Sequence, residues 1–285
     1  MIPASFSYRR AESLDDALRW LAEDPQGSKL VAGGHSLLPL MKMRLAAPRR
    51  LIDIARVSEL IGIREQSGAI VIGAGTVHRD LAGHPDVRQK LPALAEAAGK
   101  IGDLQVRNRG TIGGSLSHAD PSADLPAALM ALAATVDIAG PAGERSLAVE
   151  EMMVAPLVTG LAPDEVLVRV RVPIPAAGSR SVYLKHPHPA SGYALAGVAV
   201  AVTLEPAGAV TAARVAVTGA GVVPFRATDA ETVLIGDRLT PARIAEAAKA
   251  AAAAGEFAGD ALMSAEYRRQ LCRVYVERAI SALVD

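Results

Sequence analysis

The sequence contains very little cysteine and few aromatic residues. One cysteine, Cys272, occurs in 285 residues, and phenylalanine, tryptophan and tyrosine together make up 3%. A single thiol excludes a disulfide within the chain. An iron–sulfur cluster needs about four thiolates, and a structural zinc site needs several cysteine or histidine ligands. The chain therefore cannot hold a cluster by itself, and we expect Cys272 to be a buried, inert thiol in a helix over 265–283.

The sequence also lacks an excess of either charge and lacks long apolar runs. Lysine plus arginine and aspartate plus glutamate are both 30, so no basic surface for nucleic acid is indicated. No apolar run reaches the roughly 18 residues of a membrane-spanning helix, and the longest, around 193–204, is typical of a strand. The first six residues lack the layout of a signal peptide. We expect a cytoplasmic protein with no membrane-spanning segment.

The order of the expected elements predicts an α+β protein. In residues 1–55 the sequence pattern predicts a compact β-α-β-α-β unit. Its strands are expected at 6–10, 29–32 and 50–54, with one helix capped by Ser13 and a second helix over 37–44. Residues 61–64 and 69–73 predict a hairpin, and so do 134–139 and 144–148. Helices are expected over 77–82 with Thr76 as the N-cap, over 91–98 and over 124–132. A strand over 167–172 ends at Pro173 and Pro175, which mark the best domain boundary.

Beyond that boundary, strands and helices come in separate runs. Three long antiparallel strands are expected at 182–185, 194–204 and 209–217, followed by helices at 228–234, 241–254 and 265–283. Such segregation is typical of an α+β module. We therefore predict one domain over 1–175, divided into parts of about 1–55 and 56–175, and a second domain over 176–285.

Two matching Gly-Gly stretches suggest a phosphate site. Gly33-Gly34 and Gly113-Gly114 each follow apolar residues and precede a small polar residue and a helix-like segment. A glycine pair lets the backbone approach a ligand closely, and the free N–H groups at a helix start attract anions. If the second helix begins at Gly114 or Ser115, two such elements could hold the two phosphates of one dinucleotide.

Other motifs allow competing interpretations. The segment 73–78 imitates a Rossmann fingerprint, but His78 replaces the third glycine, and a hairpin end with a helix cap explains it better. Segments 34–38 and 113–117 resemble nucleophile elbows that lack the closing glycine. His186 and His188 lack a third metal ligand nearby, so we expect surface or pocket residues. For Asp124, a helix N-cap and a ligand contact remain equally open.

Several motifs together carry a resemblance to a known family. These are the segment 32–36 (Ala-Gly-Gly-His-Ser) with the following 37–44, the segment 109–115 (Arg-Gly-Thr-Ile-Gly-Gly-Ser), and the segment 120–124 (Asp-Pro-Ser-Ala-Asp). They resemble the FAD-binding medium subunit of molybdenum hydroxylases, a family that includes the xanthine dehydrogenases and aerobic carbon monoxide dehydrogenases. The medium chain of the carbon monoxide dehydrogenases is the nearest likeness, over essentially the whole chain.

The resemblance implies a PCMH-type flavoprotein fold, with FAD between two α/β subdomains and a C-terminal three-stranded module. It implies that Ala32 to Leu37 and Thr111 to Ser115 meet the pyrophosphate, that Asp124 holds the sugar chain, and that Tyr193 lies against the isoalloxazine ring. The full set of implied cofactor-binding residues is Ala32, Gly33, Gly34, His35, Ser36, Leu37, Ile101, Thr111, Ile112, Gly113, Gly114, Ser115, Asp124, Leu161, Lys185 and Tyr193. Where the family usually has a basic segment after the lysine, this chain has His-Pro-His-Pro-Ala-Ser at 186–191.

The resemblance also implies an electron-relay function. A large subunit with the molybdenum cofactor oxidises the substrate, a small 2Fe–2S iron–sulfur subunit passes the electrons on, and FAD in this chain delivers them to an external acceptor. The assembly implied is a dimer of heterotrimers. One alternative is a stand-alone FAD-dependent oxidoreductase of the same fold, and another is a non-catalytic nucleotide-binding or scaffold protein.

Overall fold

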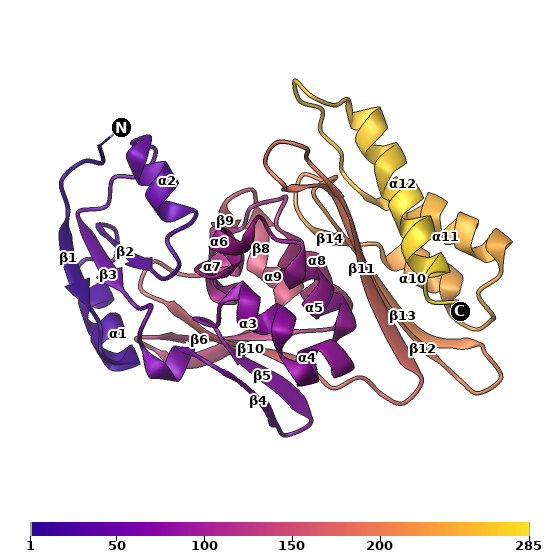
Figure 1. The fold of residues 1–285 in the computed structure, drawn as a ribbon, viewed down its shortest axis with the longest axis horizontal. Helices are drawn as coiled ribbons and strands as arrows, with labels where there is room; N and C mark the ends of the chain where they lie inside the picture. The colour runs from indigo at the N-terminus through magenta and orange to yellow at the C-terminus, as the bar shows by residue number, and fades with distance from the viewer. Residues whose placement is uncertain (1, 285) are drawn as a thin grey trace.

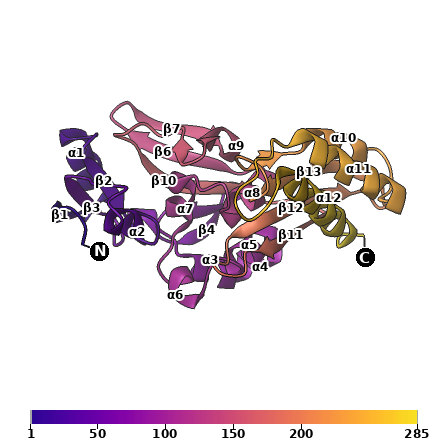
Figure 2. The same cartoon turned by 90° about the horizontal axis from the view of Figure 1, so that it is seen from above.

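The computed structural model describes residues 2–284 and consists of three units in line. Three sheets, of three, five and four strands, follow one another along the long axis from the N-terminus to the C-terminus (Figure 1). The same order is visible from above in Figure 2, where α10 and α11 lie at the opposite end from α1. A small two-stranded hairpin of β8 and β9 completes the sheets.

The N-terminal unit is a parallel three-stranded sheet with the order β1-β3-β2. Its elements are β1 (Ser7–Arg10), α1 (Leu14–Glu23), β2 (Ser28–Val31), α2 (Leu37–Lys42) and β3 (Arg50–Asp53). Ser13 caps α1, because its hydroxyl oxygen accepts a hydrogen bond from the Asp16 N–H at 3.1 Å. The predicted β-α-β-α-β unit is confirmed.

The central unit is an antiparallel sheet with the order β4-β5-β10-β6-β7. Its strands are β4 (Ile63–Gln66), β5 (Ala69–Gly73), β6 (Thr135–Gly140), β7 (Gly143–Ala148) and β10 (Val166–Pro173), with η1 (Ser58–Leu60) before them and β8 (Met153–Ala155) and β9 (Val158–Thr159) before β10. Its helices are α3 (His78–Gly83), α4 (Pro85–Lys90), α5 (Pro92–Gly99), α6 (Leu104–Arg107), α7 (Ile112–His118), α8 (Asp124–Ala131) and α9 (Val149–Met152).

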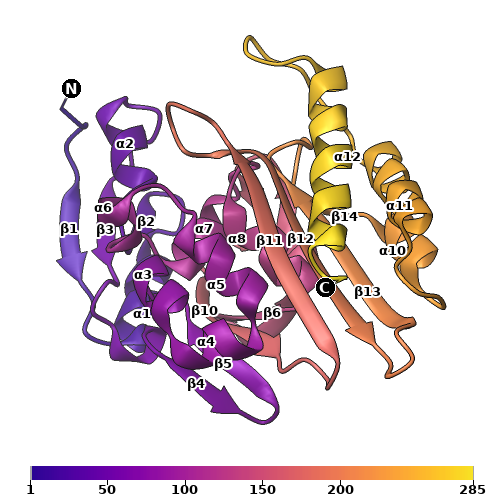
Figure 3. The ribbon, with the colours of Figure 1, turned by 45° about the vertical axis from the view of Figure 1, so that its right-hand side comes forward.

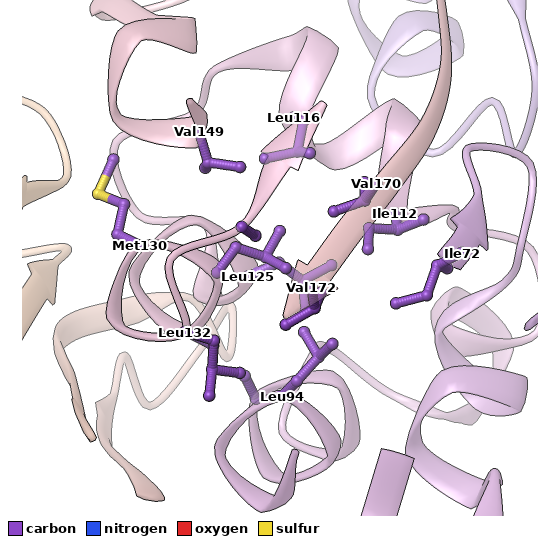
Figure 4. Close-up of a cluster of buried hydrophobic side chains, with 14 of the residues drawn as sticks. Ile72, Leu94, Ile112, Leu116, Leu125, Met130, Leu132, Val149, Val170 and Val172 are labelled. Atoms are coloured by element: carbon purple, nitrogen blue, oxygen red, sulfur yellow. The ribbon is translucent and has the colours of Figure 1, made fainter. Parts of the chain in front are cut away.

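A fully buried cluster joins the helices to the central sheet. Leu94 of α5, Ile112 of α7 and Leu125 of α8 gather around Val170 and Val172 of β10 (Figure 4). Burying a large aliphatic side chain stabilises a fold by about 1.5–3 kcal/mol relative to leaving it exposed. This core holds α7, and therefore the second Gly-Gly stretch, in a fixed place.

The C-terminal unit is an antiparallel sheet covered by three helices. The strands are β11 (Ser179–Pro187), β12 (Ala194–Leu204), β13 (Val210–Thr218) and β14 (Phe225–Arg226), and the helices are α10 (Thr228–Leu234), α11 (Pro241–Ala254) and α12 (Ala265–Ser281). Val198 and Val200 of β12 pack toward these helices, whereas Ala199 packs into the central core with α5 and α8. The apolar run of β12 is continuous because both faces of this strand are buried.

Most of the expected elements are confirmed, with three corrections. Thr76 does not cap a helix, because its hydroxyl bonds to the N–H and C=O of Gly62 at 3.0 and 3.1 Å, and Val77 is the N-cap of α3. Helix α7 begins at Ile112 and not at Gly114 or Ser115, because Thr111 caps it. The three expected C-terminal strands are present, and β14 adds a short fourth. Cys272 is buried in α12, as expected.

Candidate functional site

The first Gly-Gly stretch connects β2 to α2 and leaves its backbone donors free. Gly34 has a φ of +77°, a backbone conformation that strains any residue with a β-carbon. Within residues 2–284, no hydrogen bond is donated by the N–H groups from Gly33 to Leu37. His35 in the middle of this segment is exposed. The segment therefore presents a row of unpaired N–H groups, which is what an anionic phosphate requires.

The second Gly-Gly stretch is different, because its donors are already used. The Gly113 N–H donates to Ala74 O at 2.8 Å, and the Gly114 N–H donates to the Thr111 hydroxyl at 3.0 Å. The N–H groups of Ile112 and Ser115 also donate to backbone carbonyls. The expected symmetry of two equivalent N–H cradles is therefore wrong. Contact with a ligand from this side would come from the exposed surface of Gly114 and from the half-buried Ser115.

The two stretches nevertheless lie against each other. A β-carbon added at Gly33 would lie 2.2 Å from Arg109 O and 2.9 Å from the Gly110 α-carbon. Such distances are far below van der Waals contact, so only glycine at position 33 lets the two segments meet. Figure 3 shows the N-terminal unit next to the part of the central unit that contains α7. The proximity of the two Gly-Gly elements is thus established by the packing of the backbone.

His78 lies buried next to the place where the two stretches meet, which the sequence did not predict. Its side chain is 5% exposed, and a β-carbon at Gly110 would lie 2.8 Å from its ring atoms Cδ2 and Nε2. Burial, together with the nearby positive charges of His35 and Arg107, lowers the pKa of His78 to about 4. The ring is therefore neutral at pH 7, and its Nδ1 has no hydrogen-bond partner in the described part of the chain. The only signal in the sequence was a histidine where a Rossmann fingerprint would have glycine.

Asp124 is the centre of a buried charged network. Its carboxylate accepts hydrogen bonds from the Tyr183 hydroxyl at 2.5 Å and from Lys185 Nζ at 2.8 Å. The side chains of Asp124 and Lys185 are 5% and 4% exposed. Lys185 Nζ also donates to Lys100 O at 2.9 Å. The network links α8 to β11.

This network decides between the two interpretations of Asp124 that the sequence left open. The N-cap interpretation is wrong, because Ala123 is the N-cap of α8 and the Asp124 side chain is used elsewhere. Burial raises the pKa of Asp124, and the same burial, together with the Asp124 charge, raises the pKa of Tyr183 well above its usual value. Both carboxylate oxygens already accept hydrogen bonds from protein donors. Asp124 therefore acts first as an internal anchor for Lys185, and its contact with a sugar hydroxyl stays a prediction.

The remaining predicted residues surround the same region. Tyr193 is 46% exposed in the connection between β11 and β12, and burial of part of its ring raises its pKa. A β-carbon at Gly192 would lie 3.9 Å from the Gly102 α-carbon, which brings this connection next to Ile101. Ile101 and Leu161 are half-buried against the central core. Their contacts with a cofactor stay predictions.

The competing motifs do not form sites. His186 Nδ1 lies 3.1 Å from the Tyr275 hydroxyl, and His188 Nδ1 accepts backbone hydrogen bonds. The described residues contain no group of three histidine, cysteine or acidic side chains that could hold a metal ion. Among residues 2–284, no helix is both long and apolar enough to cross a membrane.

Comparison with known proteins agrees with this geometry over the whole chain. The family described as "FAD binding domain in molybdopterin dehydrogenase" matches residues 4–175, and "CO dehydrogenase flavoprotein C-terminal domain" matches residues 181–283. The 6-hydroxypseudooxynicotine dehydrogenase complex subunit alpha of Paenarthrobacter nicotinovorans is 41% identical, over 99% of this chain and 95% of its own. The carbon monoxide dehydrogenase medium chain of Hydrogenophaga pseudoflava is 40% identical, over 99% of this chain and 98% of its own.

A solved structure extends the agreement to three dimensions. The carbon monoxide dehydrogenase from Hydrogenophaga pseudoflava superposes with a TM-score of 0.96 at 42% identity, covering 99% of this chain and 98% of that chain. The predicted family, fold class and FAD cofactor are confirmed. This chain therefore belongs to the FAD-binding medium subunits of the molybdenum hydroxylase family and is a flavoprotein oxidoreductase component.

Proposed function

We propose that this chain is the electron-relay subunit of a three-subunit molybdenum enzyme. In this proposal a large subunit with the molybdenum cofactor oxidises the substrate, and a small 2Fe–2S subunit passes electrons to the FAD of this chain. The final acceptor is a quinone, NAD or oxygen. Bound FAD supplies the redox chemistry, while the protein supplies binding, orientation and electrostatics.

One observation supports the proposed position of the cofactor. The first Gly-Gly segment presents unpaired N–H groups from Gly33 to Leu37, and it lies directly against the second segment at Arg109 and Gly110. A pyrophosphate bound there would receive backbone hydrogen bonds from the N-terminal unit and would be covered by the central unit. Its two negative charges would supply the acceptors that these donors lack.

The other residues are assigned by their place around this junction. Lys185, held by Asp124, contributes a positive charge that is fixed in position before the cofactor binds. Tyr193 covers one face of the isoalloxazine ring in this proposal, since its ring is 46% exposed and the neighbouring Gly192 lies close to Gly102. The proposed cofactor-contacting residues are the segments 32–37 and 111–115 with Ile101, Asp124, Leu161, Lys185 and Tyr193.

We also propose a division into domains at 1–175 and 176–285, with subdomains of about 1–55 and 56–175. The separate sheets support it, since no strand pairing within residues 2–284 joins the three units. The domains share a core, however, because Tyr183 and Ala199 belong to the same buried cluster as Leu94 and Leu125. Domain 176–285 is therefore packed tightly on the flavin-binding part.

The need for partners follows from the ligands that this chain lacks. Cys272 is its single thiol, and burial raises the pKa of that thiol to about 12. A thiol that stays protonated is a poor metal ligand. Electrons must then reach the chain from a bound substrate or from a cluster in another subunit. The relatives named as a "complex subunit alpha" and a "medium chain" favour the second route. We propose a dimer of heterotrimers as the assembly.

The same relatives suggest where substrate choice resides. Proteins 41% and 40% identical to this chain are named for 6-hydroxypseudooxynicotine and for carbon monoxide, two chemically unrelated substrates. We infer that the molybdenum subunit selects the substrate, while the medium subunit serves the same electron transfer in each complex.

Purification of the tagged chain from its own host tests the proposal. We expect a yellow complex that contains two further polypeptides, with iron and molybdenum in fixed ratio to FAD. A chain that purifies alone, with FAD but without iron or molybdenum, and that turns over a small substrate would support the stand-alone flavin oxidoreductase instead.

A further inference from the structure

The connection between β11 and β12 carries the aromatic ring assigned to the flavin. Tyr193 is the last residue of this connection before Ala194, where β12 begins. Within residues 2–284, no hydrogen bond involves the Tyr193 hydroxyl, so the position of the ring depends on the backbone beneath it. The part of the connection before Tyr193 therefore decides where the ring stands.

The backbone on both sides of Tyr193 is tied to His188. The His188 N–H donates to Tyr193 O at 2.7 Å, and the Gly192 N–H donates to His188 O at 2.9 Å. Gly192 has a φ of +71°, which the tight return of the chain requires. The Ser191 hydroxyl accepts a further hydrogen bond from the Tyr193 N–H at 3.4 Å.

The side chain of His188 fixes the remaining residues of the turn. Its Nδ1 accepts hydrogen bonds from the Ala190 N–H at 3.2 Å and from the Ser191 N–H at 3.1 Å. Because two N–H groups donate to Nδ1, that nitrogen carries no proton, and the neutral ring holds its proton on Nε2. Asparagine and aspartate close turns in the same way, by accepting from N–H groups shortly after them in the chain.

His188 and Tyr193 also face the same space. Both line a hollow of about 230 Å³, whose wall includes Asp120 from the segment before α8 and Arg268 from α12. The imidazole of His188 holds the turn in this conformation through its two accepted hydrogen bonds.

We propose that His188 is the positioning residue for Tyr193: its imidazole acts as a hydrogen-bond acceptor that closes the turn 188–193 and sets the ring against the flavin. This inference rests on the proposed function, which assigns Tyr193 to the isoalloxazine ring.

Three variants test the proposal. His188→Ala removes the acceptor, His188→Asn replaces it with an amide oxygen, and His186→Phe is the matched control, because His186 contacts Tyr275 and not the turn. Hydrogen exchange in the full FAD-free chain reports directly on the Ala190 and Ser191 amides. In FAD-loaded protein, the visible spectrum and the reduction potential of the flavin report on Tyr193.

We expect His188→Ala to speed exchange of the two amides on the order of tenfold, because each amide loses its hydrogen bond to the imidazole. The same variant should shift the flavin spectrum and potential in the direction of Tyr193→Ala. His188→Asn and His186→Phe should remain close to the wild type in both measurements. Unchanged exchange in His188→Ala, or a His188→Asn variant as perturbed as His188→Ala, would overturn the proposal.

The contact of Tyr193 with the flavin and the positioning role of His188 are tested separately. If Tyr193→Ala leaves the flavin spectrum and potential unchanged, the assignment of Tyr193 to the flavin is wrong, whatever the exchange data show. If Tyr193→Ala shifts them and His188→Ala does not, Tyr193 contacts the flavin but His188 does not position it.

Discussion

Replacing Asp124 with asparagine should strongly destabilise the FAD-free chain. The carboxylate is 5% exposed and compensates the charge of Lys185, which is 4% exposed and lies 2.8 Å away. Asparagine keeps the shape and a hydrogen-bond acceptor but leaves the ammonium group without a counter-charge. Breaking a buried ion pair by removing one partner costs about 3–5 kcal/mol, a large fraction of the roughly 5–15 kcal/mol that stabilises a typical fold.

Thermal unfolding of the FAD-free variant, followed by circular dichroism, measures this effect. For a chain of this size a loss of 3–5 kcal/mol should lower the unfolding midpoint on the order of 10 °C. Asp80→Asn is the matched control, because it breaks an ion pair with Arg79 that is about half exposed. Exposed pairs contribute about 0–1 kcal/mol, so the control should melt close to the wild type.

A double variant separates the pair from its surroundings. Asp124→Asn combined with Lys185→Met removes both charges, and we expect it to be more stable than the sum of the two single losses predicts. An Asp124→Asn protein that melts like the wild type would refute this reasoning. If it also bound FAD more weakly, the carboxylate would contribute to cofactor binding but not to the stability of the FAD-free chain.

Three further predictions concern the rest of the site. Folding lowers the pKa of His78 from 6.5 to about 4, so between these pH values the unfolded chain binds a proton at His78 that the folded chain does not. The free energy of unfolding of the FAD-free chain should therefore fall by about 3 kcal/mol as the pH drops from 6.5 to 4. Urea unfolding at several pH values should show this loss in the wild type and not in His78→Phe. Gly34→Ala should lower the free energy of unfolding by about 1–2 kcal/mol, because of the positive φ at this position, and should weaken FAD binding in a fluorescence titration. Gly113→Ala should destabilise even the FAD-free chain by about 1–3 kcal/mol, because its β-carbon would lie 2.5 Å from that of Ala74. Equal FAD affinity in Gly34→Ala and the wild type would reject the first segment as the phosphate site. Cys272 should not react with a thiol reagent in the native chain and should react once in the unfolded chain, since burial raises its pKa to about 12; rapid native labelling would show that α12 opens.

The sequence was sufficient to predict the elements that are encoded locally. Ser13 before a helix and the alternation of β10 gave elements that the structure confirms, and the two Gly-Gly motifs identified the segments that meet. β14 was not predicted, because a strand of two residues is too short to show an alternating pattern of apolar and polar side chains. α4 was not among the expected helices, although Pro85 and Pro92 each begin a helix, a position at which proline is well tolerated.

Pairing between distant residues was not predictable from the sequence. The second Gly-Gly stretch looked like a donor cradle, and only its pairing with Ala74 and Thr76 shows that its N–H groups are used. Asp124 was a candidate N-cap because aspartate is common at that position. Its carboxylate instead accepts hydrogen bonds from Tyr183 and Lys185, which lie far along the chain. His78 gave only a weak local signal, a histidine in place of the third glycine of a Rossmann fingerprint, because its burial depends on packing against Gly110.

The electron-relay assignment is tested most directly by following the visible flavin absorbance under anaerobic conditions, first in the FAD-loaded chain alone and then in the complete complex. Carbon monoxide, a purine, an aldehyde and an N-heterocycle serve as candidate substrates, with a dye as the final acceptor. We predict that none of them bleaches the flavin of the isolated chain, and that adding the iron–sulfur and molybdenum subunits restores both bleaching and dye reduction with one substrate. Bleaching of the isolated chain at the rate of the complex would contradict the assignment and establish a stand-alone flavin oxidoreductase.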